Sequence, residues 1–113
     1  NRPIYLQLLE DFKLKISSGV WKSGDKMDTV RNLAKIYGVN PNTVQRALQE
    51  LEREGLAKSN RTSGRFITDD TNLIDEIAKG AFYRSCDDLI SVADELKLTK
   101  EKSLKLLEEY WRQ

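Results

Sequence analysis

The sequence predicts a mainly α-helical fold with one small β-hairpin, and three observations support that prediction. Apolar residues recur at three- and four-residue intervals over most of the chain, which is the spacing of an amphipathic helix. Between residues 56 and 68 the pattern changes to two short extended runs around a polar, glycine-containing turn. From residue 69 onward the helical spacing returns. We therefore expect helices, then a hairpin, then a helical tail.

Size and charge indicate two parts with different partners. The chain has 113 residues, enough for one small domain plus an appendage. Residues 1–68 carry 12 Lys and Arg against 7 Asp and Glu, a net charge of +5, whereas residues 69–113 carry 7 against 11, a net charge of −4. A basic segment suits a polyanion and an acidic one does not. We expect one domain at 1–69 and a helical tail at 70–113.

Several functional classes are disfavoured by what the sequence lacks. Cys86 is the only cysteine and there is no histidine, so neither a disulfide framework nor a Cys/His zinc site can form within one chain. No nucleophile-base pair or phosphate-binding glycine loop can be assembled, which argues against an enzyme. We expect no cofactor, no metal and no membrane segment, and a cytoplasmic location.

The first helix is expected from about Pro3 to about Ser18. Its apolar face consists of Ile4, Leu8, Leu9, Phe12 and Ile16. The glycine-containing loop that follows carries Val20 and Trp21, and we expect the tryptophan to attach this loop to the core. A second, short helix then begins at a cap formed by Asp28 or Thr29 and ends at Gly38. Its buried face is predicted to contain Val30, Leu33, Ala34 and Tyr37.

Both ends of the third helix can be read from the sequence. Asn40 can cap its first turn, Pro41 suits the first helical position, and Gly55 provides a left-handed stop. Its apolar stripe is Val44, Ala47, Leu48 and Leu51. The opposite, solvent side is expected to hold Asn42, Thr43, Gln45, Arg46 and Gln49.

These polar side chains suit DNA bases, because amides pair with adenine and guanidinium groups with guanine. Two helices joined by a tight turn, the second with polar groups at its N-terminus, form a helix-turn-helix. The hairpin that follows has Arg61 and Arg65 on either side of its tip, where they could follow a phosphate backbone or enter a minor groove. The alternatives are an ordinary solvated helix face and arginines without a ligand.

Residues 3–68 resemble the winged helix-turn-helix of the GntR family of bacterial transcription regulators. The matching motifs, in family order, are P-I-Y-L-Q-L, S-G-V-W-K-S-G-D-K-M, L-A before Y-G-V-N, T-V-Q-R-A-L-Q-E-L-E-R-E-G-L, and S-G-R-F-I. The version N-P-N-T-V with a short tail resembles the YtrA-like branch, which implies two dimerising helices in place of a large effector-binding domain. The expected architecture is a winged helix-turn-helix followed by a two-helix C-terminal tail.

The resemblance implies a set of DNA-contacting residues. Arg31 would read a base, and Gly64 would let the wing backbone approach DNA. It also implies that Asn42, Thr43 and Gln45 contact bases or phosphates. Together with residues predicted from the helix and hairpin patterns, the full set is Arg31, Asn40, Asn42, Thr43, Gln45, Arg46, Arg61, Gly64 and Arg65. The chain departs from the family pattern at Gln45, where an arginine is common, so we expect an operator less dependent on guanine at that position. Thr62 and Ser63 replace the usual glycine and basic residue, which weakens a minor-groove role.

The tail is expected to form one helix of about 25 residues from about Leu73, with Gly80 as a weak point within it. A break at Leu98 and Thr99 follows, and Thr99 is the expected N-cap of a last helix. So short a segment needs a partner for its apolar faces, and we favour a second copy of the chain over the winged domain. The expected dimerisation residues are Leu73, Ile77, Phe82, Leu89, Leu96, Leu107 and Trp111. The alternative is that aromatic residues of the tail, Phe82, Tyr83 and Trp111, line a small-molecule effector site.

The sequence thus predicts a sequence-specific DNA-binding transcription regulator, a homodimeric repressor that binds an inverted-repeat operator in double-stranded DNA. The alternative is a winged-helix protein-interaction module that does not bind DNA. Whether a small-molecule effector exists is left open.

Overall fold

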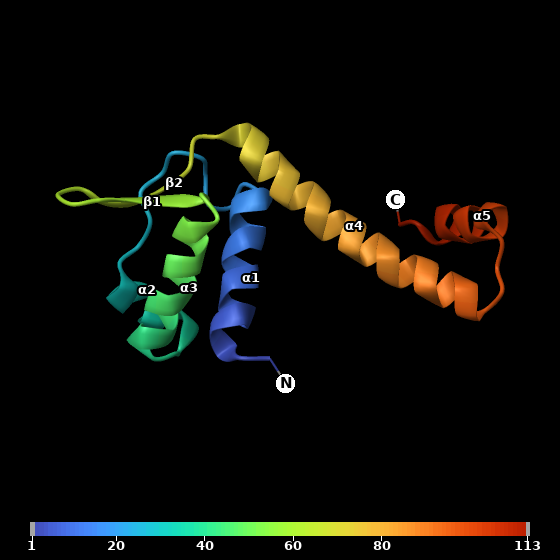
Figure 1. Cartoon of the computed structure of the whole chain (residues 1–113), viewed down its shortest axis with the longest axis horizontal. Coiled ribbons are helices and arrows are strands. Elements are labelled where there is room, and N and C mark those ends of the chain that lie inside the picture. Colours follow the sequence, from blue (N-terminus) through green and yellow to red (C-terminus); the bar gives the residue numbers. More distant parts are fainter. Residues whose placement is uncertain (1, 113) are drawn as a thin grey trace. The chain divides into compact units, whose positions relative to one another are not determined.

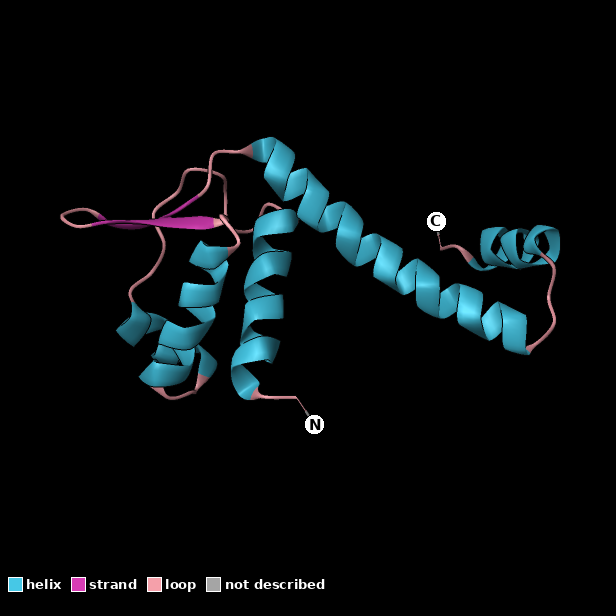
Figure 2. Cartoon of the chain, viewed as in Figure 1, coloured by secondary structure: helices cyan, strands magenta, loops and turns pink. Residues whose placement is uncertain are grey.

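The computed structural model describes residues 2–112, which form five helices and one antiparallel hairpin (Figure 1). Figure 2 shows that the hairpin supplies all of the strand structure in this part of the chain. The expectation of a mainly α-helical fold with a β-hairpin wing is confirmed. The elements are α1 (Ile4–Ser17), α2 (Val30–Tyr37), α3 (Pro41–Arg53), β1 (Ala57–Asn60), β2 (Gly64–Ile67), α4 (Thr71–Glu95) and α5 (Lys100–Tyr110).

The chain divides into two compact units, Asn1–Ala78 and Lys79–Gln113, which we call the winged unit and the tail unit. The sequence suggested a boundary at residue 69, whereas the division falls within α4. The reason is that Leu73, Ile74 and Ile77, on the first turns of α4, pack against the core of the winged unit. The beginning of α4 therefore completes the fold around the hairpin.

The core of the winged unit forms around α3. Val44, Ala47, Leu48 and Leu51 are all 0% exposed, which confirms the predicted stripe. The α1 face supplies Leu8, Leu9, Phe12 and Ile16, also as predicted. Ile4 is a correction, since it is 59% exposed. It occupies the first position of α1, before the helix reaches the core.

An aromatic cluster attaches the loop after α1 to this core. The ring of Phe12 lies 5.0 Å from that of Trp21 and 5.5 Å from that of Tyr37, the latter edge to face. The predicted anchoring role of Trp21 is therefore confirmed. Val20 is not part of the anchor, because the loop turns Trp21 inward and leaves Val20 65% exposed.

A polar cluster joins α1 to the end of α2. The Asp11 carboxylate accepts hydrogen bonds from Lys15 Nζ and from the Tyr37 hydroxyl, both at 2.6 Å. Burial, the largest single influence, raises the pKa of Asp11, but the two hydrogen bonds and the positive charge of Lys15 together lower the pKa below its ordinary value. The charged carboxylate is therefore the form that suits the folded chain.

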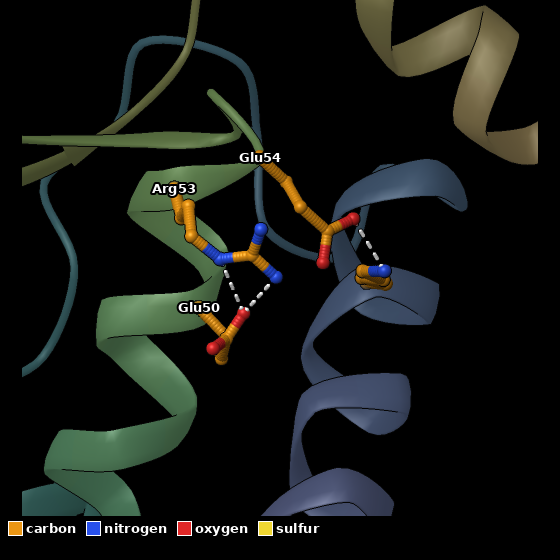
Figure 3. A network of polar contacts seen from close by, with 4 residues as sticks. Glu50, Arg53 and Glu54 are labelled. Atoms are coloured by element: carbon orange, nitrogen blue, oxygen red, sulfur yellow. Dashed lines mark hydrogen bonds and ion pairs between the residues drawn. The ribbon is translucent and has the colours of Figure 1, made fainter.

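Both ends of α3 are formed as the sequence predicts. Asn40 Oδ1 accepts a hydrogen bond from the Asn42 amide at 2.7 Å. Pro41 occupies the first turn, and Gly55 follows the helix at φ +82°. Two ion pairs surround the C-terminal end, Glu50 with Arg53 inside the helix and Glu54 with Lys13 of α1 (Figure 3).

The wing contains more pairing than its two strands. The residues opposite each other run from Ala57 with Ile67 to Asn60 with Gly64. On its other edge β2 meets the loop before α2, where the Met27 amide donates to the Arg65 carbonyl at 2.8 Å and the Ile67 amide to the Asp25 carbonyl at 2.9 Å. We had expected only a glycine-containing loop there. This second edge fixes the base of the wing.

The tail unit leaves much apolar surface exposed within one copy of the chain. The long helix runs through Gly80, and Thr99 caps α5 by accepting from the Lys102 amide at 3.1 Å, both as predicted. Ala93 is buried and Leu107 is half-buried. Trp111 follows α5 rather than lying on its face. The large exposed residues are Phe82, Tyr83, Leu89, Ile90, Val92, Leu96, Leu104, Leu106, Tyr110 and Trp111.

The position of α4 corrects part of the dimer prediction. Leu73 and Ile77 were expected on the dimer surface, but they pack against the core of the winged unit, and Leu73 lies beside Gly55.

No helix among residues 2–112 is both long and apolar enough to span a bilayer.

We expect Phe12→Ala to lower the free energy of unfolding by about 3–5 kcal/mol, because it opens a cavity between Trp21 and Tyr37. Val20→Ala, at an exposed site in the adjoining loop, should change it by no more than about 0.5 kcal/mol. Urea titration followed by circular dichroism measures both. Similar losses in the two variants would contradict the assigned core.

Candidate nucleic-acid interface

The exposed side of α3 carries a narrow polar strip. Asn42, Arg46 and Gln49 are exposed and follow one another at helical spacing. Thr43 and Gln45 are only half-buried margins of this strip, which corrects the expectation that all five side chains face solvent. The apolar stripe is broad enough to draw these two residues partly into the packing. The strip therefore centres on Asn42, Arg46 and Gln49.

Arg46 rests on an aromatic ring of α1. Its guanidinium carbon lies 3.9 Å from the centre of the Tyr5 ring, well within the range of a cation–π contact. Together with Ile4, Asn42 and Thr43, the pair lines a shallow hollow of about 360 Å³ between the first turns of α1 and α3. The Arg46 side chain is thus held near the N-terminal end of α3, and the residue remains exposed to solvent.

Arg31 is held by a well-anchored backbone and has a free side chain. It is the second residue of α2, where Thr29 Oγ1 accepts from the Asn32 amide at 3.1 Å. The nearby Asp28 carboxylate accepts from the Asn32 side chain at 2.8 Å. Arg31 is exposed and makes no hydrogen bond or ion pair with any described residue. Its guanidinium is available to an outside partner.

The tip of the wing presents Arg61 to solvent and Gly64 at φ +107°. Only glycine adopts this φ readily. A Cβ at residue 64 would also lie 3.0 Å from Lys26 Cε, so the Lys26 side chain crosses the wing here. Sequence reasoning missed Lys26. No local pattern identifies it, because only the pairing of its loop with β2 brings it to the wing.

Arg65 differs from Arg61. Its Nε donates to Glu52 Oε2 at 2.7 Å, and its side chain is only 16% exposed. The sequence grouped Arg65 with Arg61 as a DNA contact, whereas its guanidinium is engaged by the Glu52 carboxylate of α3.

Internal pairing neutralises most carboxylates of this region and leaves many cations unpaired. Five of the seven Asp and Glu side chains in residues 2–68 form ion pairs, and these occupy five of the twelve Lys and Arg side chains. The remaining seven cations have no ion pair with any described residue, and are Lys22, Lys26, Arg31, Lys35, Arg46, Lys58 and Arg61. The net charge of +5 therefore belongs to side chains free to meet an anion.

Two of the elements that carry these cations, α2 and the hairpin, lie on the side of α3 away from α1 (Figure 1). In Figure 1, α1 packs along one side of α3, while α2 and the projecting hairpin lie on the other. This arrangement can apply a helix to a groove and set a basic hairpin against the neighbouring backbone.

Comparison with known proteins places this geometry among bacterial regulators. A family model described as "Bacterial regulatory proteins, gntR family" matches residues 4–67. The uncharacterized HTH-type transcriptional regulator YhcF of Bacillus subtilis (strain 168) is 34% identical over 104 residues, which cover 92% of this chain and 86% of YhcF. The HTH-type transcriptional repressor YtrA of the same organism is 44% identical over 69 residues, covering 61% of this chain and 53% of YtrA.

Solved structures show the same architecture. A GntR family transcriptional regulator from Listeria monocytogenes superposes with a TM-score of 0.91 at 31% identity, and the match covers 98% of this chain and 97% of that one. The AraR DNA-binding domain in complex with operator ORX1 superposes with a TM-score of 0.57 at 28% identity, covering 60% of this chain and 82% of that one.

Replacing Asn40 by Ala is expected to cost about 1 kcal/mol of unfolding free energy, because the Asn42 amide loses its acceptor. Asn40→Asp keeps an acceptor at the same place and should retain most of the stability. Thermal and urea unfolding of both variants measure the difference. Equal losses for Ala and Asp would show that capping is not what residue 40 contributes to stability.

Proposed function

The chain belongs to the gntR family of bacterial regulatory proteins, and from this membership we propose that it is a transcription regulator that binds operator sites in double-stranded DNA. The observation that carries the proposal is the set of seven unpaired cations around α2, α3 and the wing. Phosphate contacts supply most of the affinity of such proteins, and a surface that has already neutralised its own carboxylates is suited to them. The operator complex of the related AraR domain agrees with this reading.

In this proposal α3 lies in the major groove and reads bases with its N-terminal end. Asn42 can bind adenine through its amide, and Arg46 is kept near the bases by Tyr5. Arg31 reads a further base from α2. Gln45, half-buried at the margin of the strip, makes the operator less dependent on guanine at its position. The phosphates of the DNA backbone are contacted by Lys26, Lys58 and Arg61. Gly64 lets the backbone of the wing come close to these phosphates.

The tail unit serves as the dimerisation device. Most of its large apolar side chains are exposed within one copy of the chain, and contiguous exposed apolar surface is typical of a protein–protein interface. A two-fold dimer would cover Phe82, Leu89, Leu96, Leu107 and Trp111 and would present two copies of α3 to half-sites about 34–36 Å apart. Leu73 and Ile77 are left out of this surface because they pack within the winged unit.

We propose repression, by obstruction of polymerase at the operator, in a cytoplasmic setting, and the relative YtrA is itself named a repressor. The cleft between α4 and α5 measures about 240 Å³, below the roughly 300–1,000 Å³ of ordinary small-molecule sites. This cleft alone does not favour an effector site, and we assign the tail to association between copies of the chain.

Selection of bound DNA from a random pool tests the function, and an enriched inverted repeat is expected. Affinity for that sequence should then fall with salt at a logarithmic slope of about −0.9 per neutralised phosphate. If no sequence is enriched and the chain instead captures a protein partner independently of salt, it is a protein-interaction module and the proposal fails.

Arg31→Ala is expected to weaken operator binding by about 1–3 kcal/mol and to relax specificity at one base pair of each half-site. Arg84→Ala removes the same charge from the tail unit and should leave both properties unchanged. Titrations against operators with single substitutions measure the effect. A uniform loss over all sequences, with a shallower salt slope, would mean that Arg31 contacts phosphate only.

Leu89→Glu is expected to convert the dimer into monomers, because it places a charge on the apolar surface of the tail. Sedimentation equilibrium reports the mass, and circular dichroism checks that the winged unit stays folded. Leu14→Glu introduces the same charge at another exposed leucine, on α1, and should leave the dimer intact. A dimer that survives Leu89→Glu and Leu104→Glu would exclude this face.

A further inference from the structure

We propose that Glu52 is a positioning residue that fixes the wing to α3, and that Arg65 acts through Glu52 and not on DNA. The contact itself lies within the free protein. Its effect on DNA binding rests on the proposed function, which it deepens. Glu52 Oε2 accepts from Arg65 Nε at 2.7 Å and from Ser59 Oγ at 3.0 Å. Arg65 belongs to β2 and Ser59 to β1, so one carboxylate oxygen holds both strands.

The register of the wing makes this possible. Ser59 and Arg65 are directly opposite each other in the hairpin, and side chains of opposed residues lie on the same face of a sheet. That face is the one turned to the end of α3. The three residues form a single contact, which we call the Glu52 clamp.

The ion pair of the clamp, between Arg65 and Glu52, is partly sheltered from water. The Arg65 side chain is 16% exposed and the Glu52 side chain 28%, and no other charged partner in an ion pair of residues 2–112 is as little exposed as Arg65. Salt screens such a pair less than an exposed one. If Arg65 left for a phosphate, it would abandon a half-buried carboxylate, which is costly. Arg65 is therefore not among the cations available to DNA.

The position of Glu52 along α3 explains why its effect on DNA is indirect. It lies ten residues beyond Asn42, about 15 Å further along the helix axis. The reading end of α3 is thus remote from the clamp. What lies beyond the clamp is the free end of the hairpin, with Arg61 at the tip.

The wing needs such a contact because a two-stranded hairpin is barely stable alone. Its strands have four residues each. One edge of β2 is tied down by the loop before α2, through the bond from the Met27 amide to the Arg65 carbonyl. That bond belongs to the backbone and survives loss of the clamp. Removing Glu52 should therefore loosen the wing without unfolding the chain.

The sign of the effect on DNA binding separates positioning from direct contact. If Glu52 acted only as a charge near DNA, Glu52→Ala would remove a repulsion and tighten binding. A positioning role predicts the opposite, a loss of between about three- and tenfold, the value of one ordinary hydrogen-bonded contact. Glu50→Ala is the matched control, because Glu50 lies on the same helix and pairs with Arg53, not with the wing.

Arg65→Met supplies a second arm, measured as operator affinity over a range of salt concentrations. We expect it to weaken binding as much as Glu52→Ala does, to leave the salt slope unchanged, and to add nothing in the double variant. Arg61→Met should instead make the slope shallower by about 0.9 per protomer. Arg65→Lys keeps the charge and should recover part of the affinity. An Arg65→Met slope like that of Arg61→Met, or tighter binding by Glu52→Ala, would overturn the proposal.

A third arm needs no DNA and separates failure of the clamp from failure of the proposed function. Amide hydrogen exchange of the free protein should quicken in Lys58–Asn60 and Gly64–Phe66 in both Glu52→Ala and Arg65→Met, and stay unchanged in Glu50→Ala. Unchanged exchange in the first two variants would disprove the clamp even if the chain binds DNA. Quickened exchange in a chain that binds no operator would support the clamp and reject the DNA-binding function.

Discussion

The burial of one stripe on α3 is the constraint on which the rest of the winged unit depends. Four side chains of this helix are wholly removed from water, and α1 and α2 pack against the helix. At about 25 cal/mol per Å² of buried apolar surface, this stripe is worth far more than any single polar contact in the unit. Because the stripe fixes the rotation of α3, it also determines that Asn42, Arg46 and Gln49 face outward.

Ion pairs on the surface of the winged unit decide which of its charges remain available. Ion pairs hold carboxylates of α1 and α3 against lysines and arginines of the same unit, as with Glu54 and Lys13. Exposed pairs of this kind add little stability. Their consequence for function is larger, because they remove acidic groups from the field that a polyanion meets and leave Arg31, Lys26 and Arg61 unopposed.

The sequence predicted the local features and missed the distant ones. Caps at Asn40 and Thr99, the stripe of α3 and the 25-residue length of α4 all follow from patterns within a few turns of chain. The contact of Arg46 with Tyr5 and that of Arg65 with Glu52 join residues far apart in sequence. Periodicity does not encode such pairs, so Arg65 was grouped with Arg61 by residue type alone.

The turn at Gly55 has a consequence for how much sequence change the chain can accept. A Cβ there would lie 3.2 Å from Leu73 Cδ2, whereas at Gly19, with nearly the same φ, it would meet nothing within 4 Å. Among residues that have a Cβ, asparagine adopts this left-handed φ most readily. A side chain at residue 55 therefore has to displace Leu73, whereas one at residue 19 meets no neighbour. The end of α3, the start of the wing and the first turns of α4 meet at that turn, so a side chain added there would act on the junction of three elements.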